Sequence, residues 1–216
     1  MDQHAFLRLL QLFDSQFPIG SFAHSSGLET YAQMDLSKEQ LAELLRVQLL
    51  YGFGRLDLAA CARAYEAESD DELVVLCAEV TAWKPIRGIR ETSLKLGKRM
   101  LTLAKRIYPQ TSDLHIPEPH QAIVCGLLGQ RLAIGKEAVL LAFAQSSVVA
   151  QLQAATRCMP LSPEQAQEIL IDVQPLIVGV VTRMLEDSEG GLVAATPALD
   201  VRAHQQAFLY TRLFQS

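Results

Sequence analysis

The sequence predicts an all-α fold, a single-domain helical bundle of about ten helices. Leu, Ala, Glu and Gln are abundant whereas aromatic residues make up 6% of the chain, and this composition favours helix over sheet. Apolar residues recur at helical spacing between helix-capping patterns, and no segment alternates as a half-buried strand would. With 216 residues, 50% of them hydrophobic, the chain is long enough to bury one substantial core.

The N-terminal region predicts one helix, a break and a second, short helix. A spacing of i, i+3, i+4 and i+7 places four apolar residues on one face of the first helix: Phe6, Leu9, Leu10 and Phe13. Pro18 and Gly20 then interrupt the chain, and the short helix is expected to begin near residue 25.

Capping patterns and glycines mark the remaining helices. Ser37 and Gln40 form a capping box, and Gly52 and Gly54 interrupt the helix that it opens. Further caps and prolines predict helices over the ranges 38–68, 69–83, 86–107, 119–133, 136–157, 163–189 and from 196 to the C-terminus.

Residues 138–156 carry no charge and approach the length of a membrane span. Five polar side chains in this range would need partners in lipid, which favours a central bundle helix instead: Gln145, Ser146, Ser147, Gln151 and Gln153. The four cysteines are widely separated, and the first residues lack the basic-then-apolar order of a signal peptide. We therefore expect a reduced, cytoplasmic protein that does not enter a membrane.

The stretch DSQFPIGSFAHSSGLE (14–29) holds the residue types of a hydrolase site. However, no serine in it lies in a G-x-S-x-G elbow and no strand precedes it. Its hydroxyls and carboxylate suit helix capping, so a structural or docking role with no catalytic residue is favoured. A hydrolase that uses His24 with a serine of this motif stays open as an alternative.

The glycine patterns do not predict a nucleotide site, and no cofactor is expected. GFGRLD, from Gly52, has Asp57 where a dinucleotide fingerprint needs its third glycine. The segment from Gly129 to Lys136 has one residue too many between its glycines for a P-loop. No metal site is predicted either, although a nickel or zinc carrier using His115, His120 or Cys158 stays open.

Positive charge is concentrated in one segment of the chain. Residues 84–106 contain eight basic residues and one acidic residue, whereas the whole chain has a net charge of −5. Helical spacing places five of the basic residues in one stripe: Lys84, Arg87, Lys95, Lys98 and Lys105. An acidic body with one basic stripe argues against nucleic-acid binding and suits either an acidic protein partner or a solvated face.

The last nine residues, FLYTRLFQS (208–216), contain five bulky apolar residues and no acidic one. Such a segment either docks into a groove of another protein or closes the core of its own chain. The sequence leaves both interpretations open.

Four blocks, in order along the chain, resemble the urease accessory protein F family. They are LLQLFDSQFPIGSFAHSSGLE (9–29), RETSLKLGKRML (90–101), AATRCMPLSPEQAQEIL (154–170) and TPALDVRAHQQAFLYTRLFQS (196–216). The resemblance implies a homodimeric, non-enzymatic chaperone of urease maturation. It would act with the D/H-type accessory protein and the G-type GTPase in GTP-dependent nickel insertion into apo-urease, and could modulate that GTPase.

The resemblance also implies which residues matter. Its motif residues here are Asp14, Ser15, Phe17, Pro18, Gly20, His24, Ser25, Gly27, Glu29, Arg90, Glu91 and Arg157. Residues 196–216 would form the partner-docking helix and tail, and binding of the D/H-type protein is expected at Arg202, His204, Tyr210, Arg212, Leu213 and Phe214. An acidic partner would contact Lys84, Arg87, Lys95 and Lys98. Gln205 stands where relatives often carry Glu, so a salt link made by that Glu is not expected here.

Overall fold

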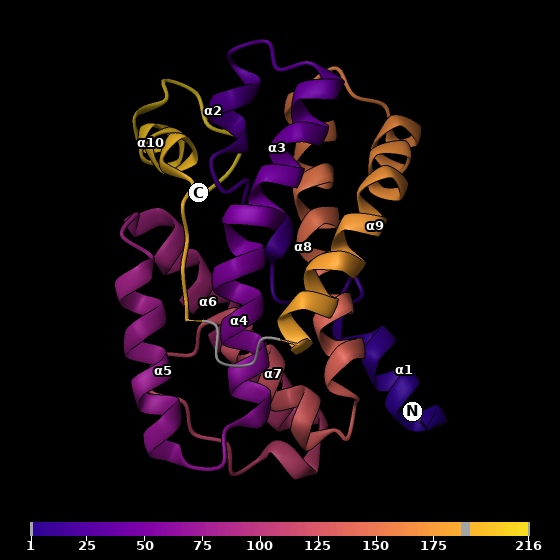
Figure 1. The fold of residues 1–216 in the computed structure, drawn as a ribbon. Coiled ribbons are helices and arrows are strands. Elements are labelled where there is room, and N and C mark those ends of the chain that lie inside the picture. Colours follow the sequence, from indigo (N-terminus) through magenta and orange to yellow (C-terminus); the bar gives the residue numbers. More distant parts are fainter. Residues whose placement is uncertain (1, 187–190, 216) are drawn as a thin grey trace.

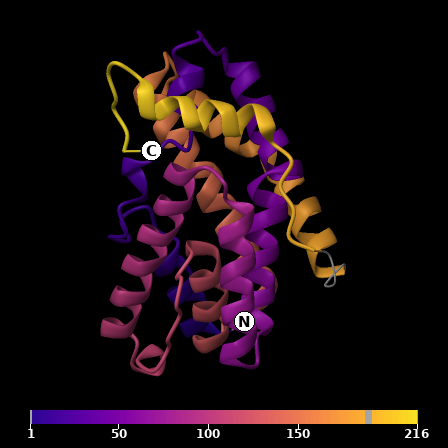
Figure 2. The same cartoon turned by 90° about the vertical axis from the view of Figure 1, so that its left-hand side faces the viewer.

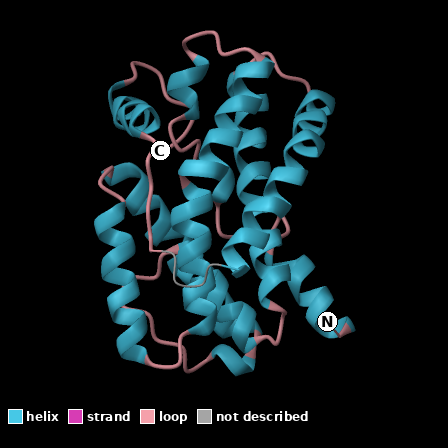
Figure 3. Cartoon of the chain, in the orientation of Figure 1, coloured by secondary structure: helices cyan, strands magenta, loops and turns pink. Residues whose placement is uncertain are grey.

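The computed structural model describes residues 2–186 and 191–215, and these residues form helices and loops with no strand (Figure 3). The predicted all-α fold is confirmed. Within the described residues the α-helices are α1 (Gln3–Leu12), α2 (Leu28–Ala32), α3 (Lys38–Tyr51), α4 (Phe53–Glu66), α5 (Asp70–Trp83), α6 (Arg87–Ile107), α7 (Gln121–Arg131), α8 (Lys136–Cys158), α9 (Pro163–Glu186) and α10 (Pro197–Gln205).

The helices form one bundle around α4 and α7 (Figure 1). Helix α4 packs most extensively against α7 and also contacts α3, α5, α8 and α9, while α6 covers the other side of α7. Helix α10 runs across one end of the bundle, over α2, as the yellow helix in Figure 2 shows. This crossing brings the C-terminal segment next to residues of the N-terminal region.

Two glycines permit close contacts of α6 and α7 with their neighbours in the core. A Cβ on Gly126 of α7 would lie 2.2 Å from the carbonyl oxygen of Cys61 on α4. A Cβ on Gly97 of α6 would lie 1.8 Å from the carbonyl oxygen of Pro119, in the loop before α7. Real Cβ atoms do not approach this closely, so α4, α6 and α7 reach their spacing only because these side chains are absent.

The predicted caps are confirmed. Ser37 Oγ accepts from the Gln40 amide at 3.3 Å, and Gln40 Oε1 accepts from the Ser37 amide at 2.9 Å. Ser162 and Gln165 form the same reciprocal pair ahead of α9. Gly52 divides the predicted helix 38–68 into α3 and α4. The predicted stop of α9 at residues 189–191 falls largely outside the described residues.

Helix α8 is the one helix of the described chain long and apolar enough to cross a membrane. It lies among α2, α4, α7 and α9, as the central-helix interpretation requires. Its polar side chains find partners within the bundle, because Gln151 accepts from Gln48 at 2.8 Å and the hydroxyls of Ser146 and Ser147 donate to the carbonyl of Phe143.

The predicted buried face of the first helix is partly wrong. Ala5 and Leu12 are buried, whereas Phe6 and Leu10 are 48% and 53% exposed. Helix α1 lies at the edge of the bundle beside α8 and can bury only a narrow stripe. Because its apolar residues cover more than one face, spacing alone does not decide which stripe is buried.

The prediction that the last helix continues to the C-terminus is also wrong. Helix α10 ends at Gln205, a short 3₁₀ turn covers Gln206–Phe208, and Leu209 is extended. The residues that follow are not helical, so the amides of residues 213 and 214 are free of helical bonding and can bind a side chain elsewhere in the chain.

Gly97→Ala is expected to lower the free energy of unfolding by about 1–3 kcal/mol or more, because the added methyl meets the Pro119 carbonyl. Gly179→Ala in α9 is the matched control, since nothing lies within 4 Å of its Cβ position and alanine favours helix by roughly 0.5–1 kcal/mol. Urea denaturation of both variants checks the pair. Equal stability of the two variants would contradict the close packing of α6.

Candidate protein-binding site

The motif between α1 and α2 is shaped by two glycines with positive φ. Gly20 has φ +83°, and Arg99 Nη1 donates to the neighbouring carbonyl of Ile19 at 3.1 Å. Gly27 has φ +91°, and a Cβ there would lie 3.1 Å from backbone atoms of Ala203 on α10. Gly27 thus lets α10 approach the start of α2, which carries Glu29.

Glu29 is 3% exposed and receives the C-terminal segment. Its Oε1 accepts from the Leu213 amide at 2.5 Å, and its Oε2 accepts from the Phe214 amide at 3.3 Å. Oε2 also accepts from Gln206 Nε2 at 3.1 Å. A buried carboxylate needs such donors, because burial without them is costly.

Gln206 links the same elements a second time. It is 2% exposed, its Oε1 accepts from the Gly27 amide at 2.9 Å, and its Nε2 donates to Ser25 Oγ at 2.8 Å as well as to Glu29. The Thr30 hydroxyl donates to the carbonyl of Arg202 at 3.0 Å. Side chains of the N-terminal motif therefore bind both the end of α10 and the segment that follows it.

Phe214 anchors the last described residues. It is 3% exposed, and the Arg157 guanidinium carbon lies 4.8 Å from its ring centroid. The Gln215 amide donates to the Ala23 carbonyl at 2.9 Å, and Lys95 Nζ donates to Gln215 Oε1 at 2.6 Å. The ring of Phe214, which the resemblance implies as a partner contact, is enclosed by the chain's own core in this structure.

The outer side of this segment is exposed and largely apolar. Tyr210 is fully exposed, while Phe208 and Leu213 are 76% and 63% exposed. His204 contacts Phe208 edge to face, with ring centroids 5.4 Å apart. We call the C-terminal face the exposed surface made by Val201, His204, Phe208, Tyr210, Arg212 and Leu213. Arg202 is half-buried beside it and donates to Gln205 Oε1.

The rest of the opening motif is mainly structural. Phe17 and Ile19 are buried, and Asp14 accepts from the Gln16 amide at 2.7 Å in a turn. Ser15 and Pro18 are exposed. These residues thus fold the turn that leads to Glu29.

The prediction that Lys84 belongs to an exposed basic stripe is wrong. Lys84 is 6% exposed at the end of α5, where its Nζ lies 2.8 and 2.9 Å from the two carboxylate oxygens of Asp57. Arg90 Nη1 donates to its carbonyl at 2.7 Å. The break at Pro85 turns the chain, so the helical spacing across residues 84–87 does not hold.

The remaining basic residues of α6 have different surroundings. Arg87 pairs with Glu91 at 2.7 Å on the surface, and Lys98 is exposed. Lys95 binds Gln215, as described above. The stripe on α6 is therefore shorter than predicted.

Two buried histidines bind adjacent hydroxyls of α6. His24 Nδ1 lies 3.2 Å from Thr92 Oγ1, and His120 Nδ1 lies 3.1 Å from Ser93 Oγ. Burial lowers the pKa of His24 to about 4, with Lys95 and Arg99 contributing. Burial, with Lys84 second, also lowers the pKa of His120 to about 4. Both imidazoles are neutral at pH 7.

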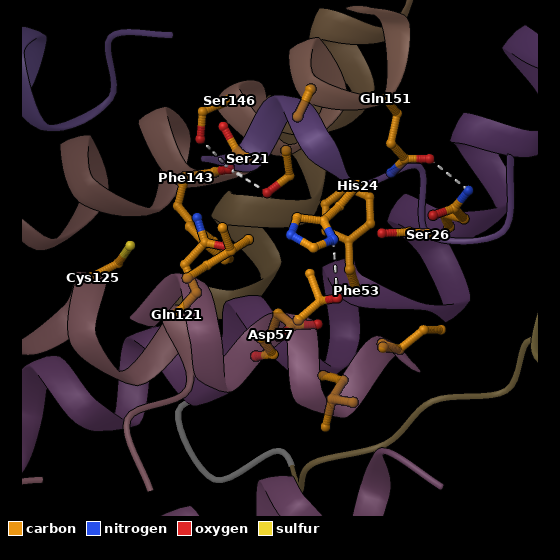
Figure 4. Close-up of a pocket in the computed structure, with 18 of the residues that line it drawn as sticks. Ser21, His24, Ser26, Phe53, Asp57, Gln121, Cys125, Phe143, Ser146 and Gln151 are labelled. Carbon is orange, nitrogen blue, oxygen red and sulfur yellow. Dashed lines mark hydrogen bonds between the residues drawn. The ribbon is translucent and has the colours of Figure 1, made fainter. Parts of the chain in front are cut away.

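A cavity of about 900 Å³ lies between α1, α4, α6, α7 and α8, and His24 projects into it (Figure 4). Its polar lining is bonded internally through the pairs Gln48–Gln151, His24–Thr92 and Asp57–Lys84. A general base works best with a pKa near the working pH, so His24 is poorly suited to hydrolysis at pH 7. The hydroxyl of Ser25 is engaged by Gln206.

The structure does not support the carrier alternative. His115 is exposed, whereas His120 is fully buried with its Nε2 2.9 Å from Thr81 Oγ1. Burial raises the pKa of the Cys158 thiol to about 11. Across residues 2–186 and 191–215, no three His, Cys, Asp or Glu side chains gather as a metal site would need.

Comparison with known proteins decides the family. The sequence model of the UreF family matches residues 36–174. The chain belongs to the UreF family. The chain is 34% identical to the urease accessory protein UreF of Haemophilus influenzae (strain PittEE), over 96% of this chain and 94% of that protein. It is 30% identical to the corresponding protein of Nostoc sp., over 100% and 98%, and 32% identical to that of Bacillus sp. (strain TB-90), over 97% and 98%.

Within this UreF-family chain, the family motif includes Glu29 and Ser25, but local sequence does not indicate the roles of two further residues, Gln206 and Lys95. A glutamine near a helix end, such as Gln206, has no distinctive sequence pattern. Lys95 was assigned to an outer stripe, whereas it holds Gln215. Neither contact has a signal in the local sequence, since each joins residues more than 100 positions apart.

The buried histidines predict a loss of stability in mild acid. The folded pKa values of about 4 lie below the unfolded value of 6.5, so the unfolded chain binds more protons between these values. The contribution of these neutral histidines to the free energy of unfolding is fully present above pH 6.5. It is lost as the pH drops toward 4, by on the order of 3 kcal/mol for each histidine. Urea denaturation between pH 4.5 and 7.5 measures this slope.

His120→Asn is expected to reduce that slope. His115→Asn, at an exposed site, serves as the control and should retain the wild-type slope. A slope that His120→Asn leaves unchanged would show that other groups cause the acid sensitivity.

Proposed function

We propose that this chain is a non-enzymatic scaffold of urease maturation, acting in the cytoplasm as a homodimer. It binds the D/H-type accessory protein and the G-type GTPase, and the complex docks on apo-urease for GTP-dependent nickel insertion. Membership of the UreF family and the printed names of its relatives, urease accessory proteins, support this proposal.

The observation that carries the proposal is the C-terminal face. Phe208, Tyr210 and Leu213 expose large apolar side chains on a segment whose backbone is bound to the body of the chain. Large apolar side chains exposed close together in the sequence are typical of protein–protein contacts, and aromatic residues contribute strongly to binding. The surface supports docking of the D/H-type protein here.

Modulation of the partner GTPase is the finer part of the proposal. The arginines of α6 differ in how accessible they are to a partner. Arg99 donates to the carbonyl of Ile19 and Arg90 donates to the carbonyl of Lys84, whereas Arg87 forms an exposed ion pair with Glu91. Exposed ion pairs are weak, so Arg87 is the member of this set that a partner could recruit most readily. We propose that the scaffold acts on the GTPase chiefly by positioning it.

Tyr210→Ala is expected to weaken binding of the D/H-type protein at least about tenfold, because exposed aromatic residues at interface centres often contribute more than 1–2 kcal/mol. Isothermal titration calorimetry with the purified partner measures the change. Val178→Ala, an exposed apolar site on α9, is the matched control and should bind as the wild type does.

Removal of the last dozen residues tests the same surface without reliance on one side chain. Copurification with the D/H-type protein should be lost. Retained copurification would refute docking through this segment. Ester hydrolysis that disappears in His24→Ala would instead favour an enzyme, and stoichiometric nickel binding by the isolated chain would favour a carrier.

A further inference from the structure

Short side chains on α8 form one wall of the cavity of about 900 Å³. Residues four apart lie on one face of a helix, and four small residues at this spacing line the cavity: Ala138, Ala142, Ser146 and Ala150. Helix α1 lies beside α8 at the edge of the bundle, and Leu9 and Phe13 line the cavity from that side. The short side chains on α8 therefore leave room between α1 and the core of the bundle.

The lining is chiefly apolar and includes four aromatic side chains (Figure 4). These come from the end of α1, from α4, from α5 and from α8, and they are Phe13, Phe53, Trp83 and Phe143. Water against an apolar lining finds few hydrogen-bond partners, whereas an aromatic ring gains contact with apolar and aromatic surface. Small-molecule sites are lined in this way and have volumes of roughly 300–1,000 Å³. The cavity thus has the size and the lining of such a site.

The charges on the lining indicate the charge of the ligand. Within the described residues, Asp57 and Lys84 pair with each other at 2.8 Å, and His24 is neutral at pH 7 and bonded to Thr92. Asp14 is exposed and Asp200 is half-buried, so neither offers a counter-charge in the buried part of the cavity. A charged ligand would lose its hydration there without compensation, which is costly. The lining therefore favours an uncharged molecule.

The cavity reaches the surface beside α1 and at the end of α5. Leu10 and Trp83 both line it, and they are 53% and 41% exposed. Helix α1 is tied to the bundle by Arg8, which donates to the carbonyl of Leu132, and by Gln11, which accepts from the Tyr108 hydroxyl. An edge helix that forms one wall gives a small molecule a path into the cavity.

We propose that this cavity binds an uncharged aromatic small molecule between α1, α8 and the side chains of Phe53, Trp83 and Phe143. This binding activity is additional to the scaffold function proposed above and does not depend on it. A molecule held in this cavity binds the folded chain and not the unfolded one, so it stabilises the fold.

Trp83 reports on binding, because it is the single tryptophan of the chain and lines the cavity. The probe is N-phenyl-1-naphthylamine, an uncharged aromatic amine whose fluorescence increases in apolar surroundings. Binding should saturate at one probe per chain, with energy transfer from Trp83. The anion 8-anilinonaphthalene-1-sulfonate adds a sulfonate to the same ring system and should bind at least about tenfold more weakly.

Two substitutions on α8 narrow the cavity. Ala142→Leu and Ala150→Leu should each weaken binding of the neutral probe at least about tenfold, because the added carbons occupy the volume that the rings need. Ala198→Leu makes the same change at an exposed site on α10 outside the lining and should bind the probe as the wild type does. Circular dichroism establishes folding, and the comparison of the two probes on the wild type tests the proposal even if a variant does not fold.

The results that would overturn the proposal are specific. Binding that does not saturate, or folded Ala142→Leu and Ala150→Leu variants that bind as the wild type does, would mean that the probe binds elsewhere. Equal affinity for the sulfonate and the neutral amine would refute the preference for an uncharged molecule. A midpoint of thermal unfolding that saturating neutral probe leaves unchanged would also contradict binding inside the fold.

Discussion

The buried carboxyl group of Glu29 determines how α2 meets the C-terminal segment of the described chain. A charge at this depth costs several kcal/mol unless donors surround it. The donors come from Gln206 and from two amides of the non-helical C-terminal segment. Because helical amides are already bonded, the amides of Leu213 and Phe214 can reach Glu29 only because they lie outside α10, which ends at Gln205.

The surroundings of Glu29 support this arrangement. Gly27 allows α10 to approach α2, Gln206 fills the space between them, and Arg157 covers Phe214. The residues of the motif at 14–29 thus share a structural role, although the serines and the histidine in it are residue types that hydrolase sites also use. His24 sits in the adjoining cavity as a neutral imidazole bound near Thr92, in a site suited to packing at neutral pH.

Local sequence predicts some features of this chain correctly and others not. The capping boxes at Ser37 and Ser162 were predicted correctly, since each depends on residues three positions apart. The prediction that Lys84 belongs to the basic stripe was wrong, because Pro85 turns the chain and the ammonium group of Lys84 pairs with Asp57 on α4. The buried stripe of α1 could not be predicted either, because the choice depends on how α8 lies beside it.

The sequence by itself determined the all-α class, the helix boundaries near caps and glycines, and four blocks that identify the family. All of these depend on short-range periodicity, backbone freedom or residue order. Only the tertiary structure decided that Glu29 binds the C-terminal segment, that Phe214 is enclosed, and that Tyr210 and Leu213 face outward. The bonds of Glu29 join residues 184 and 185 positions apart, and the need of a buried carboxyl group for donors is visible only once the packing that buries it is known.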